Sequence, residues 1–133
     1  MKRQITLAVL FFLFSLETFS QNFAWAKQLG GVGSENSYAI AVDANGNVYT
    51  TGYFWLTTDF DPGIGTYNLT SAGLYDIFVS KLDASGNFIW AKQIGGTSND
   101  VGFSITVDAN GNIYTTGYFR DTVDFDPGPV HII

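Results

Sequence analysis

Short runs of β-branched, aromatic and small residues fill the chain beyond residue 20, and glycine- and asparagine-rich breaks separate them. Residues 37–42 alternate apolar and small side chains, while residues 47–54 are rich in the β-branched and aromatic types that strands favour. The runs at 23–29 and 76–82 have the length of strands, and a shorter run lies around 66–70. No helical periodicity over about ten residues is found in this part of the sequence. The pattern predicts an all-β protein with sheets covered on both sides, because several runs are apolar or small on both faces.

Three breaks between these runs share one pattern, Asp-Ala-Asn/Ser-Gly-Asn, and they lie at 43–47, 83–87 and 108–112. The aspartate can accept hydrogen bonds from its own downstream backbone, and the glycine supplies the positive φ that closes a short hairpin. The oxygens of Asp43 and Asn45 would also suit Ca²⁺. However, the glycine comes fourth rather than sixth as in an EF-hand loop, and no glutamate follows at the twelfth position. We therefore expect hairpin turns, with an ion site as the alternative.

The chain repeats itself at a fixed offset of 65 residues, which three separate blocks share. The matched blocks are Phe23–Gly31 with Phe88–Gly96, Ala41–Phe54 with Thr106–Phe119, and Asp59–Gly63 with Asp124–Gly128. One unit reads as four main strands, and the next unit begins at Phe88. This organisation predicts a first repeat over residues 21–87 and a second, truncated repeat over residues 88–133.

Four antiparallel strands per repeat, with periodic glycine and aromatic residues, are typical of a β-propeller blade. The segments VDANGNVYTTGYF, DIFVSKLDASGNFIWAKQIGG and DFDPG resemble the bacterial β-propeller repeat known as SBBP, and the resemblance covers residues 23–128. It implies four-stranded antiparallel blades in an exported protein of a Bacteroidetes-type bacterium, without assigned catalytic residues.

The second repeat stops before the counterpart of residues 76–82, so about 1.7 blades are present, whereas propellers close with about 4–8. We expect an open, incomplete propeller that is a fragment of a longer product. A small open β-sheet protein and an assembly of several chains are the alternatives.

The first twenty residues have the three parts of a secretory signal peptide. Lys2 and Arg3 form a basic start, residues 5–16 are almost wholly apolar, and Thr18 and Ser20 are small residues at the −3 and −1 positions. The apolar run is shorter than the roughly 20 residues that span a bilayer. We expect residues 1–20 to be a signal peptide cleaved after Ser20, leaving no membrane span, and the product to be secreted or held at the cell surface.

Charge and composition exclude several classes of function. The chain has a net charge of −6, and removal of residues 1–20 leaves 4 basic against 11 acidic residues, a net charge of −7. Nucleic acids require a basic surface, so we expect no nucleic-acid partner. The chain has no cysteine and a single histidine, His131, so it has neither a disulfide framework nor a zinc cluster of the usual kind.

The repeated DFDPG block contains the acidic residues most suited to chemistry. Successive strand residues point to opposite faces, so Asp59 and Asp61 would project together, and Asp124 and Asp126 repeat the arrangement. Paired carboxylates can hold Ca²⁺ or act as an acid/base pair. Because the pair recurs once per repeat, whereas an active site is normally built once, we expect a structural motif, with a weak Ca²⁺ site as the alternative and no other cofactor.

Three tryptophans differ in how they fit the repeat. Trp25 and Trp90 occupy matched positions, and we expect them in the core between blades, with sugar stacking as the alternative. The counterpart of Trp55 is Arg120, so this position varies between copies and is where we expect a ligand contact.

The leading functional hypothesis is an exported, non-enzymatic scaffold that binds a surface glycan or protein. The alternatives are a structural spacer and the propeller portion of a larger secreted hydrolase or lyase. Open blade edges also predict self-association.

Overall fold

The computed structural model describes residues 22–126 and 128, so the proposed signal peptide and His131 lie outside the described residues. The described part is all-β with no helix, as predicted, and no helix there is long and apolar enough to cross a membrane. Its strands are β1 (Gly30–Gly31), β2 (Glu35–Val42), β3 (Val48–Asp59), β4 (Asn68–Leu82), β5 (Phe88–Gly96), β6 (Val101–Val107), β7 (Ile113–Tyr118) and β8 (Val123–Asp124).

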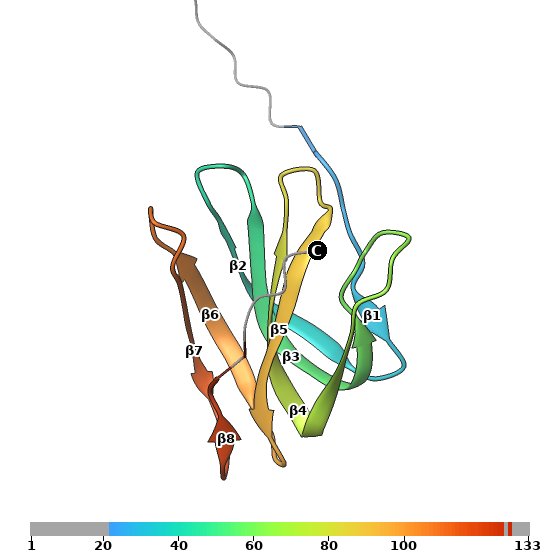
Figure 1. Ribbon diagram of the computed structural model, residues 1–133, viewed down its shortest axis with the longest axis vertical. Coiled ribbons are helices and arrows are strands. Elements are labelled where there is room, and N and C mark those ends of the chain that lie inside the picture. The colour runs from blue at the N-terminus through green and yellow to red at the C-terminus, as the bar shows by residue number, and fades with distance from the viewer. Residues whose placement is uncertain (1–21, 127, 129–133) are drawn as a thin grey trace, which may run out of the picture.

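Strands β2, β3, β4 and β5 form a continuous antiparallel meander, which we call the first sheet (Figure 1). Strand β1 pairs with the far end of β3, and β8 pairs with the end of β5. Strands β6 and β7 form a separate hairpin that packs against the first sheet. Neither sheet closes on itself, which fits blades of an incomplete propeller.

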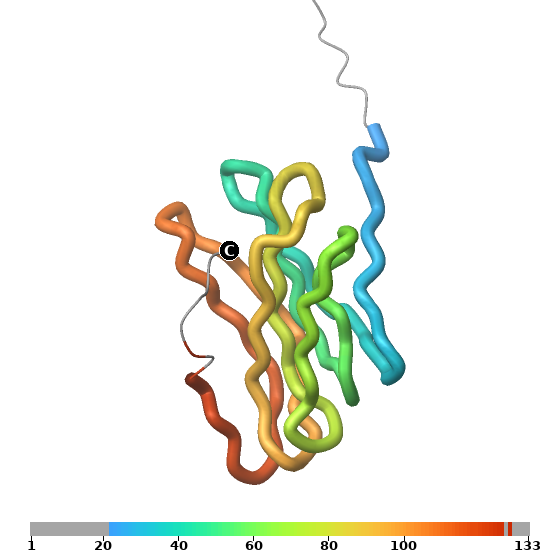
Figure 2. Tube along the Cα trace, turned by 45° about the vertical axis from the view of Figure 1, so that its right-hand side comes forward, coloured from blue at the N-terminus to red at the C-terminus, as the bar shows by residue number. Residues whose placement is uncertain are grey.

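The three predicted turns are confirmed, and Figures 1 and 2 show them together at one end of the molecule. The turn aspartates are Asp43, Asp83 and Asp108. Each accepts backbone hydrogen bonds at 2.8–2.9 Å from the residues two and four positions ahead, and a third bond from an asparagine side chain. The turn glycines have φ between 79° and 84°. The aspartate and the glycine therefore do what the local sequence predicts.

The prediction of a strand over residues 23–29 is wrong, because only Gly30–Gly31 is a strand in this region. The matched segment Phe88–Gly96 forms β5 by pairing with residues 77–82 of β4. A strand requires a neighbour for its hydrogen bonds, and the described residues contain no counterpart of β4 beside residues 23–29. The short run predicted around 66–70 is also not separate: it is the beginning of β4.

The core consists of two clusters on opposite faces of the first sheet. Phe54, Phe60, Phe78 and Ala91 form one cluster. Tyr49 and Val79 form the other with Ile105 of β6, so this cluster joins the first sheet to the β6–β7 hairpin. Because Phe78 and Val79 are neighbours on β4, they point to opposite faces, and the first sheet has a core on both sides.

The hydrogen-bonded sheets and the sequence repeat are out of phase by one strand. Strand β5 begins the second copy of the sequence, yet it completes the first sheet. The pairing of Gly30 with Asp59 recurs 65 residues later as Gly95 with Asp124. Strand β4, the last strand of the first sequence unit, therefore pairs with β5, the first strand of the second unit.

Candidate functional site

A β-bulge places an aromatic side chain at the same position of each repeat. The ladder between β2 and β3 shifts at Tyr38, and the ladder between β6 and β7 shifts at Phe103, 65 residues later. A Cβ on Gly52 would overlap the Asn36 carbonyl oxygen, and the matched Gly117 is equally close to a carbonyl. Glycine is therefore required opposite each bulge, and the bulge changes the direction in which its aromatic residue points.

Six aromatic rings form a continuous band across both repeats, which we call the aromatic band. Tyr38 is in contact with Tyr53 of the first sheet and with Phe103 of β6, with ring centroids 5.9 and 5.5 Å apart. The band continues from Tyr53 through Tyr75 to Trp55 and from Phe103 to Tyr118, with steps of 4.6–6.4 Å. These separations lie in the range in which aromatic pairs attract one another.

The band is partly open to solvent, since Tyr38 and Phe103 are each 49% exposed. A hollow of about 260 Å³ lies at its Trp55 end and is lined by Trp55, Leu74, Tyr75 and Asn99. Sites that enclose small molecules usually have volumes of about 300–1,000 Å³. The band therefore offers an extended apolar surface, and the hollow at its end is smaller than most small-molecule sites.

Trp55, the one position expected to contact a ligand from its variation between copies, lies at the end of the band. Arg120, its counterpart, is exposed, and its backbone N–H donates to Asp100 at 2.9 Å. The residues that follow them, Leu56 and Asp121, have φ of 63° and 62°, a left-handed conformation that is rare outside glycine. Sequence reasoning missed the other five rings of the band. The available signal was an aromatic residue at matched positions in both copies, opposite a glycine.

The two matched tryptophans have different surroundings. Trp90 packs against the cluster of Tyr49, Val79 and Ile105, so its predicted place between blades is confirmed. Trp25 is half-buried, and its indole N–H donates to the carbonyl oxygen of Ala84 at 3.1 Å. It lies against the other face of the first sheet, in a groove that Ile40 also lines.

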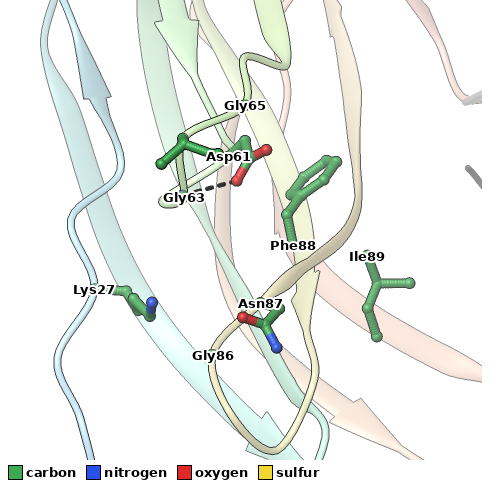
Figure 3. A pocket seen from close by; sticks show the side chains of 9 residues that line it. Lys27, Asp61, Gly63, Gly65, Gly86, Asn87, Phe88 and Ile89 are labelled. Atoms are coloured by element: carbon green, nitrogen blue, oxygen red, sulfur yellow. Dashed lines mark hydrogen bonds between the residues drawn. The ribbon is translucent and has the colours of Figure 1, made fainter.

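The repeated acidic motif forms a series of local hydrogen bonds. Asp59 accepts from the backbone N–H groups of Asp61 and Tyr67 at 3.0 and 2.8 Å. Asp61 accepts from Gly63 at 2.8 Å, as Figure 3 shows in a pocket of about 560 Å³ that Lys27 also lines. In the second copy, Asp124 and Asp126 each accept a backbone bond at 2.9 Å, from the residue two positions ahead. The carboxylates thus hold the turn in both copies, and the described residues contain no group of three or more potential metal ligands.

Two buried acids that the sequence did not indicate lie on β4 and in the loop after β5. Asp100 is fully buried, and its carboxylate accepts from the backbone N–H groups of Gly96 and Arg120. Asp76 is also fully buried and accepts from Ala72 and Gln93 through one oxygen, while its other oxygen has no partner. Burial raises the pKa of the Asp76 carboxyl, although these two hydrogen bonds oppose the rise. Asp100 fixes the loop after β5, and Asp76 lies on β4 next to Tyr75 of the band.

Two segments of the chain, residues 24–53 and 89–118, match the family described as "Beta-propeller repeat", SBBP. Both limits differ by 65 residues, the period of the sequence. The chain is 30% identical over 112 residues to an uncharacterized WD repeat-containing protein of Acanthamoeba polyphaga mimivirus. It is 26% identical over 106 residues to the regulatory protein FlaEY of Caulobacter vibrioides. The matches cover 74% and 80% of this chain but 8% and 11% of those proteins, so the chain spans a small part of each.

Proposed function

Because the chain carries β-propeller repeats of the SBBP type, we propose that it is a non-enzymatic binding scaffold that recognises a protein through the aromatic band. The observation that carries this proposal is the continuity of six partly exposed rings across two repeats. Tyrosine and tryptophan are the residues most enriched at the energetic centres of protein interfaces. The kinship with a WD repeat-containing protein supports a role in protein recognition.

The geometry of the rings favours a protein over a glycan as the ligand. Neighbouring rings are tilted or edge-on, with interplanar angles of 42–77°, and they pack on one another. This arrangement makes one continuous apolar surface with phenolic hydroxyls, rather than separate flat platforms for sugar rings. A protein side chain that enters the hollow beside Trp55 and Asn99 would fix the register of the partner.

The place of action follows from the sequence rather than from the fold. Residues 1–20 support export, so we propose that the scaffold acts outside the cell or at the cell surface. Fusion of residues 1–20 to a reporter enzyme tests this part: export of the reporter is expected, and its retention in the cytoplasm would reject extracellular action.

The binding proposal is tested with the paired substitution Tyr38→Ala/Phe103→Ala, which removes the centre of the band in both repeats. A partner captured from a cell-surface fraction should bind this variant at least about tenfold more weakly, since a hot-spot residue contributes 2 kcal/mol or more. Ile64→Ala removes an exposed apolar side chain outside the band and should bind as the unmodified chain does. Equal binding by all three proteins would reject the band as the site, and binding only on a glycan array would replace the protein with a sugar ligand.

A further inference from the structure

Matched residues of the two repeats differ sharply in exposure. Tyr49 is 2% exposed, whereas its counterpart Tyr114 is 57% exposed. On the opposite face of the sheets it is the residue of the first repeat that is exposed: Ile40 is 66% exposed, whereas its counterpart Ile105 is 7% exposed. Each residue is buried only where a neighbouring unit covers it, so among the described residues one face is uncovered on each side.

The chain already contains the contact that would cover both open faces. In the internal interface, Ala39, Ala41 and Tyr49 of the first sheet pack with Ile105, Val107 and Ile113 of the β6–β7 hairpin. The first group has the counterparts Ser104, Thr106 and Tyr114, which we call the trailing face. The second group has the counterparts Ile40, Val42 and Val48, which we call the leading face.

The two open faces keep the backbone geometry of the internal interface. Ala41 pairs with Tyr49 across β2 and β3, and Thr106 pairs with Tyr114 across β6 and β7 in the same register. Val42 likewise pairs with Val48, as Val107 pairs with Ile113. The residues of the leading face are aliphatic, as are the β6–β7 residues to which they correspond. The trailing face keeps the tyrosine and has two small residues beside it.

One wall of the leading face is already formed. A groove of about 370 Å³ is lined by Ile40 and Val48 together with Trp25. Trp90, the counterpart of Trp25, packs on the internal interface. Trp25 therefore has the same position relative to the leading face that Trp90 has relative to Ile105 and Ile113 in the internal interface. A trailing face would form the other wall of this groove.

We propose that the occupant of the trailing face is the leading face of a second copy of this chain. The contact is head-to-tail, because the two faces are different surfaces of one chain, and such contacts close into rings or extend as open chains, unlike an isologous contact in which one surface meets itself. If the contact keeps the angle of the internal interface, the ring closes at a propeller's 4–8 blades, which is roughly two to four copies. The trailing face has no counterpart of β4 among the described residues, so the contact is smaller than the internal one and weak, as small transient interfaces are.

The test uses one variant for each face. Ile40→Lys removes the leading face and Tyr114→Lys removes the trailing face. Both side chains are more than half exposed, so far-UV circular dichroism should show an unchanged fold for both variants. Sedimentation velocity over a range of concentrations should show concentration-dependent association of the unmodified chain, and each variant alone should associate at least tenfold more weakly.

The decisive measurement is the mixture of the two variants. The Ile40→Lys copy keeps its trailing face and the Tyr114→Lys copy keeps its leading face, so an equimolar mixture should form a heterodimer and nothing larger. Ile64→Lys, a charge placed at an exposed position outside both faces, should associate like the unmodified chain. A chain that stays monomeric at several hundred micromolar, variants that still associate, or a mixture without a heterodimer would each overturn the proposal. Nonspecific aggregation would appear as association that the variants do not weaken and that mixing does not restore.

Discussion

Phe54 and Phe119 are the same residue in the same local sequence, and we predict that truncating them has very different consequences. Phe54 is 0% exposed and packs edge-on against Phe60 at 5.4 Å, in the cluster that includes Phe78. Phe119 is 54% exposed and has the matched ring, Phe125, beside it at 5.0 Å. No equivalent of Phe78 covers Phe119 among the described residues, so one wall of its pocket is missing.

The magnitudes follow from this burial. Phe54→Ala should lower the free energy of unfolding by about 3–5 kcal/mol, because it removes a buried ring and leaves a cavity. Phe119→Ala should lower it by about 1 kcal/mol, because roughly half of a ring worth 1.5–3 kcal/mol is buried. The difference between the two variants is then about 3 kcal/mol, which corresponds to roughly 1–3 M in the urea midpoint for a slope of 1–3 kcal/mol per molar.

The assay is urea unfolding followed by tryptophan fluorescence, at a protein concentration below that of self-association. Trp90 reports on the internal interface, and far-UV circular dichroism on the same samples checks that the transitions coincide. Equal shifts of the midpoint in the two variants would refute the reasoning, because burial by the neighbouring unit would then not decide the stability of the ring. A larger shift for Phe119→Ala would refute it more strongly.

Three further predictions concern polar groups and the backbone. Asp76→Asn should raise the free energy of unfolding at pH 7, on the order of 1 kcal/mol, since it removes a buried charge with an unpartnered oxygen. The gain should shrink as the pH falls, because the raised pKa means that Asp76 of the unmodified chain protonates and loses this penalty. The turn aspartates act with the opposite sign: hydrogen bonds hold their pKa below the ordinary value of 3.8, so they stabilise the fold above that pH and lose this effect below it. Carboxyl titration by NMR should give pKa values under 3.8 for all three, and values at or above it would contradict the turn geometry. Gly52→Ala should cost about 1–3 kcal/mol in urea unfolding through its overlap with the Asn36 carbonyl, whereas Gly30→Ala, which has room for a Cβ, should change stability by less than about 0.5 kcal/mol.

The turns and the repeat were predictable from the sequence because the forces that form them are local. An aspartate that accepts hydrogen bonds from residues two and four positions ahead needs no distant partner, and the turn at Asp83 forms as the one at Asp43 does. The strand expected over residues 23–29 failed for the converse reason: its counterpart β5 is held by β4, which is a contact between two strands rather than a property of either.

The aromatic band was only partly predictable. Variation between the copies pointed to Trp55, but a bulge is needed to bring Tyr38 between Tyr53 and Phe103, and hydrophobic alternation alone does not reveal a bulge. The buried charge of Asp76 was equally hidden, because its partner Gln93 lies on β5 and the neighbouring charge of Asp100 lies in the loop after β5. Both features arise where segments distant in sequence meet.

The contrast between Tyr49 and Tyr114 separates what a repeated sequence specifies from what its surroundings specify. Both hydroxyls donate to the aspartate of their own turn, at 3.1 and 3.3 Å, so the local structure is reproduced. Among the described residues only Tyr49 has a second unit over its ring, so burial is not reproduced. In repeat proteins, stability is approximately the sum of terms within units and terms between neighbours. Within the described residues the second kind of term is satisfied once, between the first sheet and the β6–β7 hairpin, and the proposed contact with a second copy would supply the same kind of term again.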